Sequence, residues 1–307
     1  MARGDTTDTG GRARALMLAL AGFACLSVGD AFAKSMGGEW PGTAVAALRY
    51  IFGLIGLAIA VALTHGRAGF VCPRPWLQLG RGTAVGVATF GFFMGVHAMP
   101  LADATAIVFA SPIITALLSP LVLRERTTRA TMLATLLAFA GVLIVLRPNV
   151  TELGMVALYP LGAAFGMSWL MMLNRKAAGD APVAVMQFLL AAIAAPLLVA
   201  AAGLLDLFGG PPFQIPMPSA EVVLKCLAVA FFATLGHTLI YAAVTRASAQ
   251  VVAPMTYVQL LVAVGIGWSL FGEAPDVATL GGAALIILGG LWLWRAQKAP
   301  AVARTPD

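Results

Sequence analysis

Charged side chains within a long apolar run are the first candidates for chemistry in this sequence. Asp30 is the only acidic residue well inside such a run, and Ser27, Asp30 and Lys34 follow one another at helical spacing. They therefore share one helix face, and Arg49 lies at a similar level in the next run. Because a charge inside a membrane is costly, these groups indicate a function. They would bind a zwitterionic or anionic substrate, or Asp30 would take part in proton coupling. The alternative is an ion pair at the helix end, with Lys34 extending to the interface.

A second polar pattern follows one face of a later apolar run. His237 and Tyr241 are four residues apart, and Thr234 and Thr245 extend the same stripe. Such a stripe either lines a central cavity or holds helices together by hydrogen bonds. Trp169, Tyr257 and Gln259 would add an aromatic and amide lining to a cavity, although aromatic residues are also common in apolar helices.

Ten apolar runs must position these groups, and each is close to the 20 residues that a membrane-spanning helix needs. The chain of 307 residues is 60% hydrophobic and only 10% charged, which excludes an ordinary soluble domain. The runs lack the alternation of a membrane barrel, so we expect an all-α integral membrane protein. The predicted spans are Ala15–Ala33, Thr43–Leu63, Gly82–Met99, Ala104–Leu123, Ala130–Leu146, Gly154–Leu173, Ala184–Leu205, Val222–Val244, Val251–Phe271 and Val277–Trp294.

The net charge of +6 is explained by membrane topology and does not indicate a nucleic-acid partner. If ten helices span and the N-terminus is cytoplasmic, 15 of the 19 lysines and arginines lie on the cytoplasmic side. This bias is the positive-inside rule. We therefore expect a multi-pass protein of the bacterial inner membrane with both termini in the cytoplasm.

The two halves of the chain repeat each other. An offset of 148 residues aligns a series of matching positions, while early in each half the offset is about 140, because the Gly209–Ser219 connection lengthens the second half. Five helices per half is an odd number, so the halves would be inverted in the membrane, as in many transporters. The predicted boundaries are a tail (1–14), a first repeat (15–148), a second repeat (149–296) and a tail (297–307). The matching positions are Glu125 and Glu273, Thr131 and Thr279, Gly141 and Gly289, and Arg147 and Arg295.

The repeat extends the polar patterns to other segments. By the 148-residue offset, Thr89, Phe93 and His97 lie on the face of the third run that corresponds to the stripe of the eighth. The fourth run contains Pro112 and its counterpart, the ninth, contains Pro254. Interrupted helices in corresponding positions of two halves are typical of a transport site.

Several segments resemble the drug/metabolite transporter superfamily, EamA type. They are P-L-A-D-A-T-A-I with the following S-P and R-E-R, and A-P-M-T-Y-V-Q-L-L with W-S-L-F-G-E-A-P-D and L-G-G-A-A-L-I-I-L-G-G. The resemblance covers about Ala15 to Arg295 and implies a ten-helix carrier of the inner membrane. Many members export amino acids and related metabolites, while others carry riboflavin or S-adenosylmethionine. The positions of Asp30, Lys34 and Arg49 look like those of this last branch. The chain departs from the pattern at Leu260, the repeat equivalent of Pro112.

No phosphate loop, zinc-ligand spacing or nucleophile elbow occurs, and Cys25, Cys72 and Cys226 form no C-x-x-C pair. We therefore predict no catalytic residue, metal or cofactor. The leading hypothesis is a secondary transporter, monomeric or homodimeric, that moves a small amino-acid-like metabolite, with export ahead of uptake of riboflavin or S-adenosylmethionine. The rivals are an intramembrane enzyme using Asp30 and His237, and an accessory subunit without transport. Glu125 and Glu273 are expected at helix ends or gates.

Overall fold

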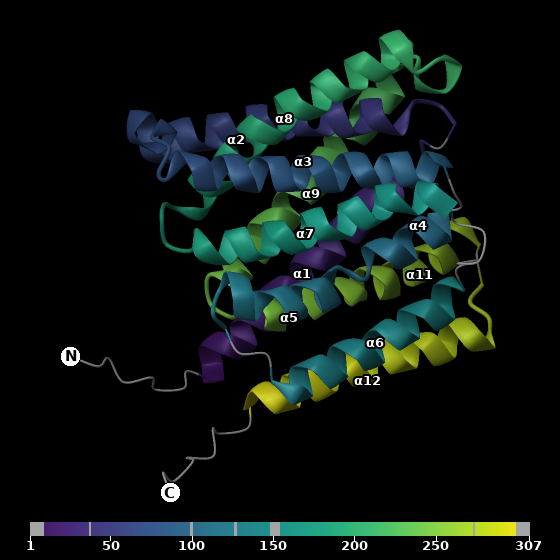
Figure 1. Cartoon of the computed structure of the whole chain (residues 1–307). Coiled ribbons are helices and arrows are strands. Elements are labelled where there is room, and N and C mark those ends of the chain that lie inside the picture. Colours follow the sequence, from purple (N-terminus) through teal and green to yellow (C-terminus); the bar gives the residue numbers. More distant parts are fainter. Residues whose placement is uncertain are drawn as a thin grey trace, which may run out of the picture.

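The computed structural model describes residues 9–36, 38–98, 101–125, 128–147, 154–272 and 274–298. Within these residues the chain forms helices joined by short connections, and no β-strand occurs (Figure 1). In chain order the elements are α1 (Thr9–Lys34), α2 (Gly42–His65), η1 (Gly66–Phe70), α3 (Pro75–Ala98), α4 (Leu101–Val108), α5 (Ser111–Val122), α6 (Arg129–Leu146), η3 (Gly154–Ala157), α7 (Leu158–Lys176), α8 (Val183–Phe208), η4 (Pro211–Phe213), α9 (Ala220–Val244), α10 (Ala249–Val252), η5 (Ala253–Thr256), α11 (Tyr257–Phe271) and α12 (Val277–Lys298).

Each predicted apolar run overlaps one of these helical segments. Within the described residues, eight stretches are long and apolar enough to cross a membrane. The segment Val277–Leu293 of α12 is apolar but shorter, and α3 is not among the eight. The structure is thus that of an all-helical integral membrane protein, while the number of ten spans stays a prediction.

Two segments of the bundle are interrupted, and a proline lies at each interruption. Pro112 lies in the first turn of α5, directly after the break from α4, and Pro254 lies in η5 between α10 and α11. Proline lacks a backbone N–H and therefore cannot continue the hydrogen bonding of a helix. Phe109 and Tyr257, which the 148-residue offset relates, meet edge to face with ring centroids 6.1 Å apart. The two interrupted segments thus approach each other where their helices break.

The helices pack most extensively in four pairs, which are α1 with α9, α3 with α7, α2 with α8, and α6 with α12. Small residues allow this closeness. A Cβ atom added to Gly22 of α1 would lie 2.9 Å from the carbonyl oxygen of Gly236 in α9, and one added to Gly236 would lie 2.8 Å from that of Gly22. The two backbones therefore touch without intervening side chains.

The bundle has two ends. Figure 1 shows that α1 begins and α12 ends on the same side, which we name the terminal face; the other end is the opposite face. The α2–α8 pair lies at one edge of the bundle and the α6–α12 pair at the other (Figure 1).

Candidate functional site

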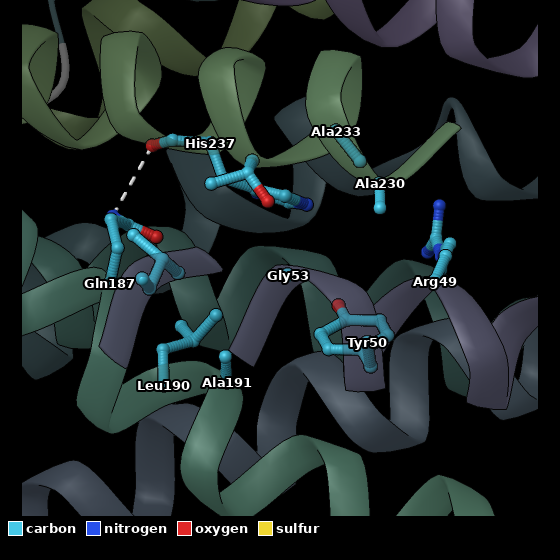
Figure 2. A pocket seen from close by; sticks show the side chains of 11 residues that line it. Arg49, Tyr50, Gly53, Gln187, Leu190, Ala191, Ala230, Ala233 and His237 are labelled. Atoms are coloured by element: carbon cyan, nitrogen blue, oxygen red, sulfur yellow. Dashed lines mark hydrogen bonds between the residues drawn. The ribbon is translucent and has the colours of Figure 1, made fainter. Parts of the chain in front are cut away.

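A cleft of about 350 Å³ lies between α2, α8 and α9 (Figure 2). Its walls are mostly apolar, and its polar side chains are those of Arg49, Tyr50, Gln187, Thr234 and His237. Figure 2 shows Gln187 and His237 toward one end and Arg49 at the other. The Gln187 side-chain amide donates to the His237 carbonyl oxygen at 3.3 Å. The lining residues are Arg49, Tyr50, Gly53, Leu57, Gln187, Leu190, Ala191, Ala230, Ala233, Thr234 and His237.

Asp30 joins α1 to α11 beside this cleft. The Gln259 side-chain amide donates to the Asp30 carboxylate at 2.5 Å, and the Ser27 hydroxyl donates to the Gln259 carbonyl oxygen at 2.8 Å. Asp30 is exposed, one turn before the end of α1. Two of the predicted site residues, Asp30 and Gln259, thus come together from different halves of the chain.

Arg49 carries the opposite charge in the same region. Its guanidinium lies 5.1 Å from the centre of the Tyr50 ring, and its charge acts on both Asp30 and His237. Within the part of the chain that the structure describes, no ion pair within 4 Å joins Arg49 to Asp30, and the buried Arg49 Nε has no hydrogen-bond partner. A carboxylate and a guanidinium with unused hydrogen-bonding capacity therefore lie near each other, which suits a ligand that carries both charges.

The predicted stripe on α9 divides between two environments. Thr234 and His237 line the cleft, whereas Tyr241 is completely buried and its hydroxyl donates to the Ala177 carbonyl oxygen at 2.8 Å. Thr245 donates to a carbonyl oxygen one turn back in its own helix. Thr234 and His237 thus face the cleft, whereas Tyr241 links α9 to the end of α7.

The remaining predicted residues lie outside the cleft. Tyr257 is buried against Phe109, and its hydroxyl has no partner among the described residues. Trp169 on α7 is 44% exposed, and Lys34 is exposed at the last residue of α1.

The face predicted on the third run is only partly described. Thr89 lies 3.5 Å from the Tyr50 hydroxyl, and Phe93 packs against Gly42. His97 lies in α3, but its side chain is outside the described part of the structure, as is Glu273.

Arg81 is a site residue that the sequence reasoning missed. It is fully buried, yet within the described residues no carboxylate pairs with it. Its guanidinium donates to the side chains of Asn174 at 2.8 Å and Gln78 at 2.6 Å, and to the Met186 carbonyl oxygen at 3.1 Å. It also lies 5.0 Å from the centre of the Tyr241 ring. We name this group, Gln78, Arg81, Asn174 and Tyr241, the arginine cluster; it joins α3 to α7, α8 and α9. The i, i+3 spacing of Gln78 and Arg81 was the available signal.

Further ionic links tie the terminal face together. Arg175 at the end of α7 pairs with Glu125 at 2.8 Å and donates to the Val244 carbonyl oxygen at 3.0 Å. Arg74 forms an ion pair with Asp180. Together with the arginine cluster, these links connect residues of the first half to residues of the second.

No group of three His, Cys, Asp or Glu side chains among the described residues could hold a metal ion, and no hydrogen bond joins Asp30 to His237.

Known proteins resemble the chain along most of its length. Residues 13–147 and 154–295 each match the EamA-like transporter family. The chain is similar to an S-adenosylmethionine uptake transporter of Rickettsia bellii (25% identity, 89% of this chain and 90% of the relative) and to a riboflavin transporter of Vibrio cholerae (30% identity, 66% of each). It is also similar to a pseudopaline exporter of Pseudomonas aeruginosa, with 26% identity over 92% of this chain and 96% of the relative.

A crystal structure of another protein has the same fold, with a TM-score of 0.76 at 20% sequence identity. The match covers 93% of this chain and 99% of the chain in that crystal structure. Both family matches together account for nearly all of the described helices. The chain therefore belongs to the EamA-like transporter family and is a transmembrane small-molecule transporter rather than an enzyme.

Proposed function

We propose that the chain is a secondary transporter of a small polar metabolite with an amino-acid-like zwitterionic group, and that it works by alternating access. In this proposal the two halves are inverted in the bacterial inner membrane, and the terminal face lies in the cytoplasm. The positive-inside bias of the sequence supports that orientation. The packing supports the inversion: exchanging the halves turns the α1–α9 pair into α7–α3 and leaves the α2–α8 and α6–α12 pairs unchanged.

The observation that carries the proposal is the pair of unmatched opposite charges at Asp30 and Arg49. A carboxylate binds an ammonium group, and a planar guanidinium binds a carboxylate through two parallel hydrogen bonds. Asp30 makes one hydrogen bond through Gln259, and Arg49 Nε makes none within the described residues. Both charges would therefore be available to the two ends of a zwitterion.

The difference between the two ends of the bundle supports alternating access. Asp30 lies one turn before α1 ends at the opposite face and is exposed there. The terminal face is tied across the halves by the arginine cluster and by the Arg175–Glu125 and Arg74–Asp180 pairs. The opposite face is also linked across the halves, by the Arg147–Asp276 and Lys225–Glu39 pairs, but these side chains are partly exposed, whereas Arg81 of the arginine cluster is fully buried. This difference suits a carrier that is closed more firmly toward the terminal face than toward the opposite face. The reverse state requires the links at the terminal face to break.

Export of the metabolite is our first choice of direction, and the similarity to a pseudopaline exporter favours it. Uptake of S-adenosylmethionine or riboflavin is the second candidate. The chain covers 90% of a relative named as an S-adenosylmethionine uptake transporter and 66% of one named as a riboflavin transporter. Alternating access itself is symmetric, so the gradient of substrate or coupling ion decides the direction.

The test is counterflow in proteoliposomes, with labelled amino acids, S-adenosylmethionine and riboflavin offered separately. We expect uptake of at least one amino-acid-like compound into preloaded vesicles. Arg49→Gln and Asp30→Asn should each weaken its binding about 10- to 100-fold, since a hydrogen bond to a charged group contributes about 1.5–3 kcal/mol.

The matched control is Arg67→Gln, which removes an exposed arginine of η1 and should leave counterflow unchanged. Folding of each variant is checked by gel filtration. The proposal fails if none of the compounds exchanges, or if a zwitterion exchanges equally well in wild type, Arg49→Gln and Asp30→Asn.

A further inference from the structure

A second and larger cavity lies on the other side of the bundle, away from the cleft. It is a groove of about 760 Å³ between α1, α6, α12 and the junction of η5 with α11. Leu16 and Leu20 form its α1 wall, Ala134 its α6 wall, and Gly290 and Leu291 its α12 wall. Every lining side chain is apolar except that of Tyr257. A groove of this composition suits a hydrocarbon chain and not the polar substrate of the cleft.

The groove lies at a defined depth. Leu16 is seven residues from the start of α1, Ala134 five from the start of α6, and Leu291 seven from the end of α12. At 1.5 Å per residue, these positions are roughly 8–11 Å from the terminal face. Half of the hydrocarbon core is about 15 Å thick, so these lining residues lie at the depth of the leaflet next to that face.

Each of the three long helices that line the groove carries an arginine at its terminal-face end. These are Arg14 of α1, Arg129 of α6 and Arg295 of α12. All three are exposed, and none forms an ion pair with another described residue. Figure 1 shows the corresponding ends of α1, α6 and α12 on one side of the molecule. By contrast, Arg74 and Arg175 at the same face are held by Asp180 and Glu125.

An apolar groove with unneutralised positive charge at its mouth matches the two parts of an anionic phospholipid. We propose that the groove holds an acyl chain of an anionic phospholipid from the leaflet at the terminal face, with its phosphate at Arg14, Arg129 and Arg295. Guanidinium groups bind phosphate oxygens through paired hydrogen bonds, so the arginines would select the headgroup. The acyl chain would fill the space between α1 and the α6–α12 pair.

The test measures lipid binding to the purified full chain by native mass spectrometry. Phosphatidylglycerol and phosphatidylcholine with identical acyl chains are titrated separately at low salt. We expect phosphatidylglycerol to bind up to about 100-fold more tightly, from three arginines near the membrane surface. The triple variant Arg14→Gln/Arg129→Gln/Arg295→Gln should reduce its affinity to that of phosphatidylcholine.

A second variant tests the groove itself. Gly290→Leu places a side chain where no atom lies within 4 Å of the added Cβ, so it should fill the groove without displacing a neighbour. Binding of both lipids should then weaken. Arg67→Gln is the matched control for charge and should keep the preference for phosphatidylglycerol.

Three outcomes overturn the proposal. The first is equal binding of the two lipids by wild type. The second is a preference for phosphatidylglycerol that remains in the triple variant, or that Arg67→Gln removes as completely as the triple variant does. The third is a dimer that Gly290→Leu disrupts, because a second copy of the chain would then occupy the groove.

Discussion

Removing the buried guanidinium of Arg81 should destabilise the protein strongly. In Arg81→Met the new side chain fills much of the same space but donates no hydrogen bond, so Asn174 Oδ1, Gln78 Oε1 and the Met186 carbonyl oxygen lose their donor. An unsatisfied buried acceptor costs about 1–3 kcal/mol. Relief of the desolvated charge, including the unpartnered Nη2 atom, offsets part of this cost. Since no carboxylate among the described residues pairs with Arg81, its removal leaves no buried charge behind, and we expect a net loss of about 1–3 kcal/mol.

The assay is equilibrium unfolding by sodium dodecyl sulfate in mixed micelles. Arg67→Met on the exposed η1 segment is the control and should change the free energy of unfolding by less than about 0.5 kcal/mol. The loss in free energy of unfolding for Arg81→Lys should lie between those of Arg67→Met and Arg81→Met. An ammonium keeps the charge but cannot reach all three acceptors in their present geometry. If Arg81→Met is as stable as wild type or more stable, the hydrogen bonds do not outweigh the cost of burying the charge, and our account of the arginine cluster is wrong.

The same variant should also change access to the cleft. A cysteine introduced at Gln187, near the end of the cleft that lies toward the terminal face, reports that access through its labelling by a membrane-impermeant maleimide. Labelling from the terminal face should be faster with Arg81→Met than with Arg81 present. Equal labelling rates would mean that the arginine cluster does not close this side.

Two further predictions follow from contacts elsewhere in the fold. Arg147 donates to both carboxylate oxygens of Asp276 and holds the pKa of that carboxyl below its usual range. This stabilisation is complete above the unfolded pKa of about 3.9 and is lost as the pH falls below it. Wild type should therefore lose stability more steeply than Asp276→Asn between about pH 5 and pH 2. The free energy of unfolding measured at each pH tests this, and parallel curves for the two proteins would contradict it. Gly22→Leu should separate α1 from α9, because its Cβ would meet the Gly236 carbonyl oxygen, and should destabilise the protein by about 1–3 kcal/mol. The control is Gly56→Leu on α2, where an added Cβ atom meets nothing within 4 Å. The measurement is the fraction of monodisperse protein in gel filtration, which should fall for Gly22→Leu and stay unchanged for Gly56→Leu. Equal fractions for the two variants would refute the close contact.

The helical fold could be predicted from the sequence because hydropathy alone determines which segments enter a membrane. Every predicted apolar run overlaps a helical segment, and the prolines at 112 and 254 mark the two interruptions. The number of spans does not follow from hydropathy in the same way, because α3 combines Arg81 and several glycines with its apolar residues and is not among the eight apolar stretches.

The site was harder to predict because its chemistry depends on contacts between distant segments. Asp30 was identified as a charge inside an apolar run, but its partner Gln259 lies 229 residues away. Tyr241 belongs to the predicted stripe by spacing, yet it packs against Arg81 and donates to the Ala177 carbonyl oxygen, away from the cleft. Arg81 itself looks like a loop arginine at the edge of a run, since no sequence pattern reveals that Asn174 will receive its hydrogen bonds.

The close contact of α1 with α9 also bears on the order in which the protein is made. Gly22 and Gly236 are more than 200 residues apart, so at about 5–20 residues per second the ribosome completes α9 roughly 10–40 s after α1. During that time the glycine surface of α1 faces lipid, and the helix needs an apolar exterior all round to remain in the bilayer alone. Asp30 is a charged exception on that exterior, and its hydrogen-bond partner Gln259 is synthesised later still.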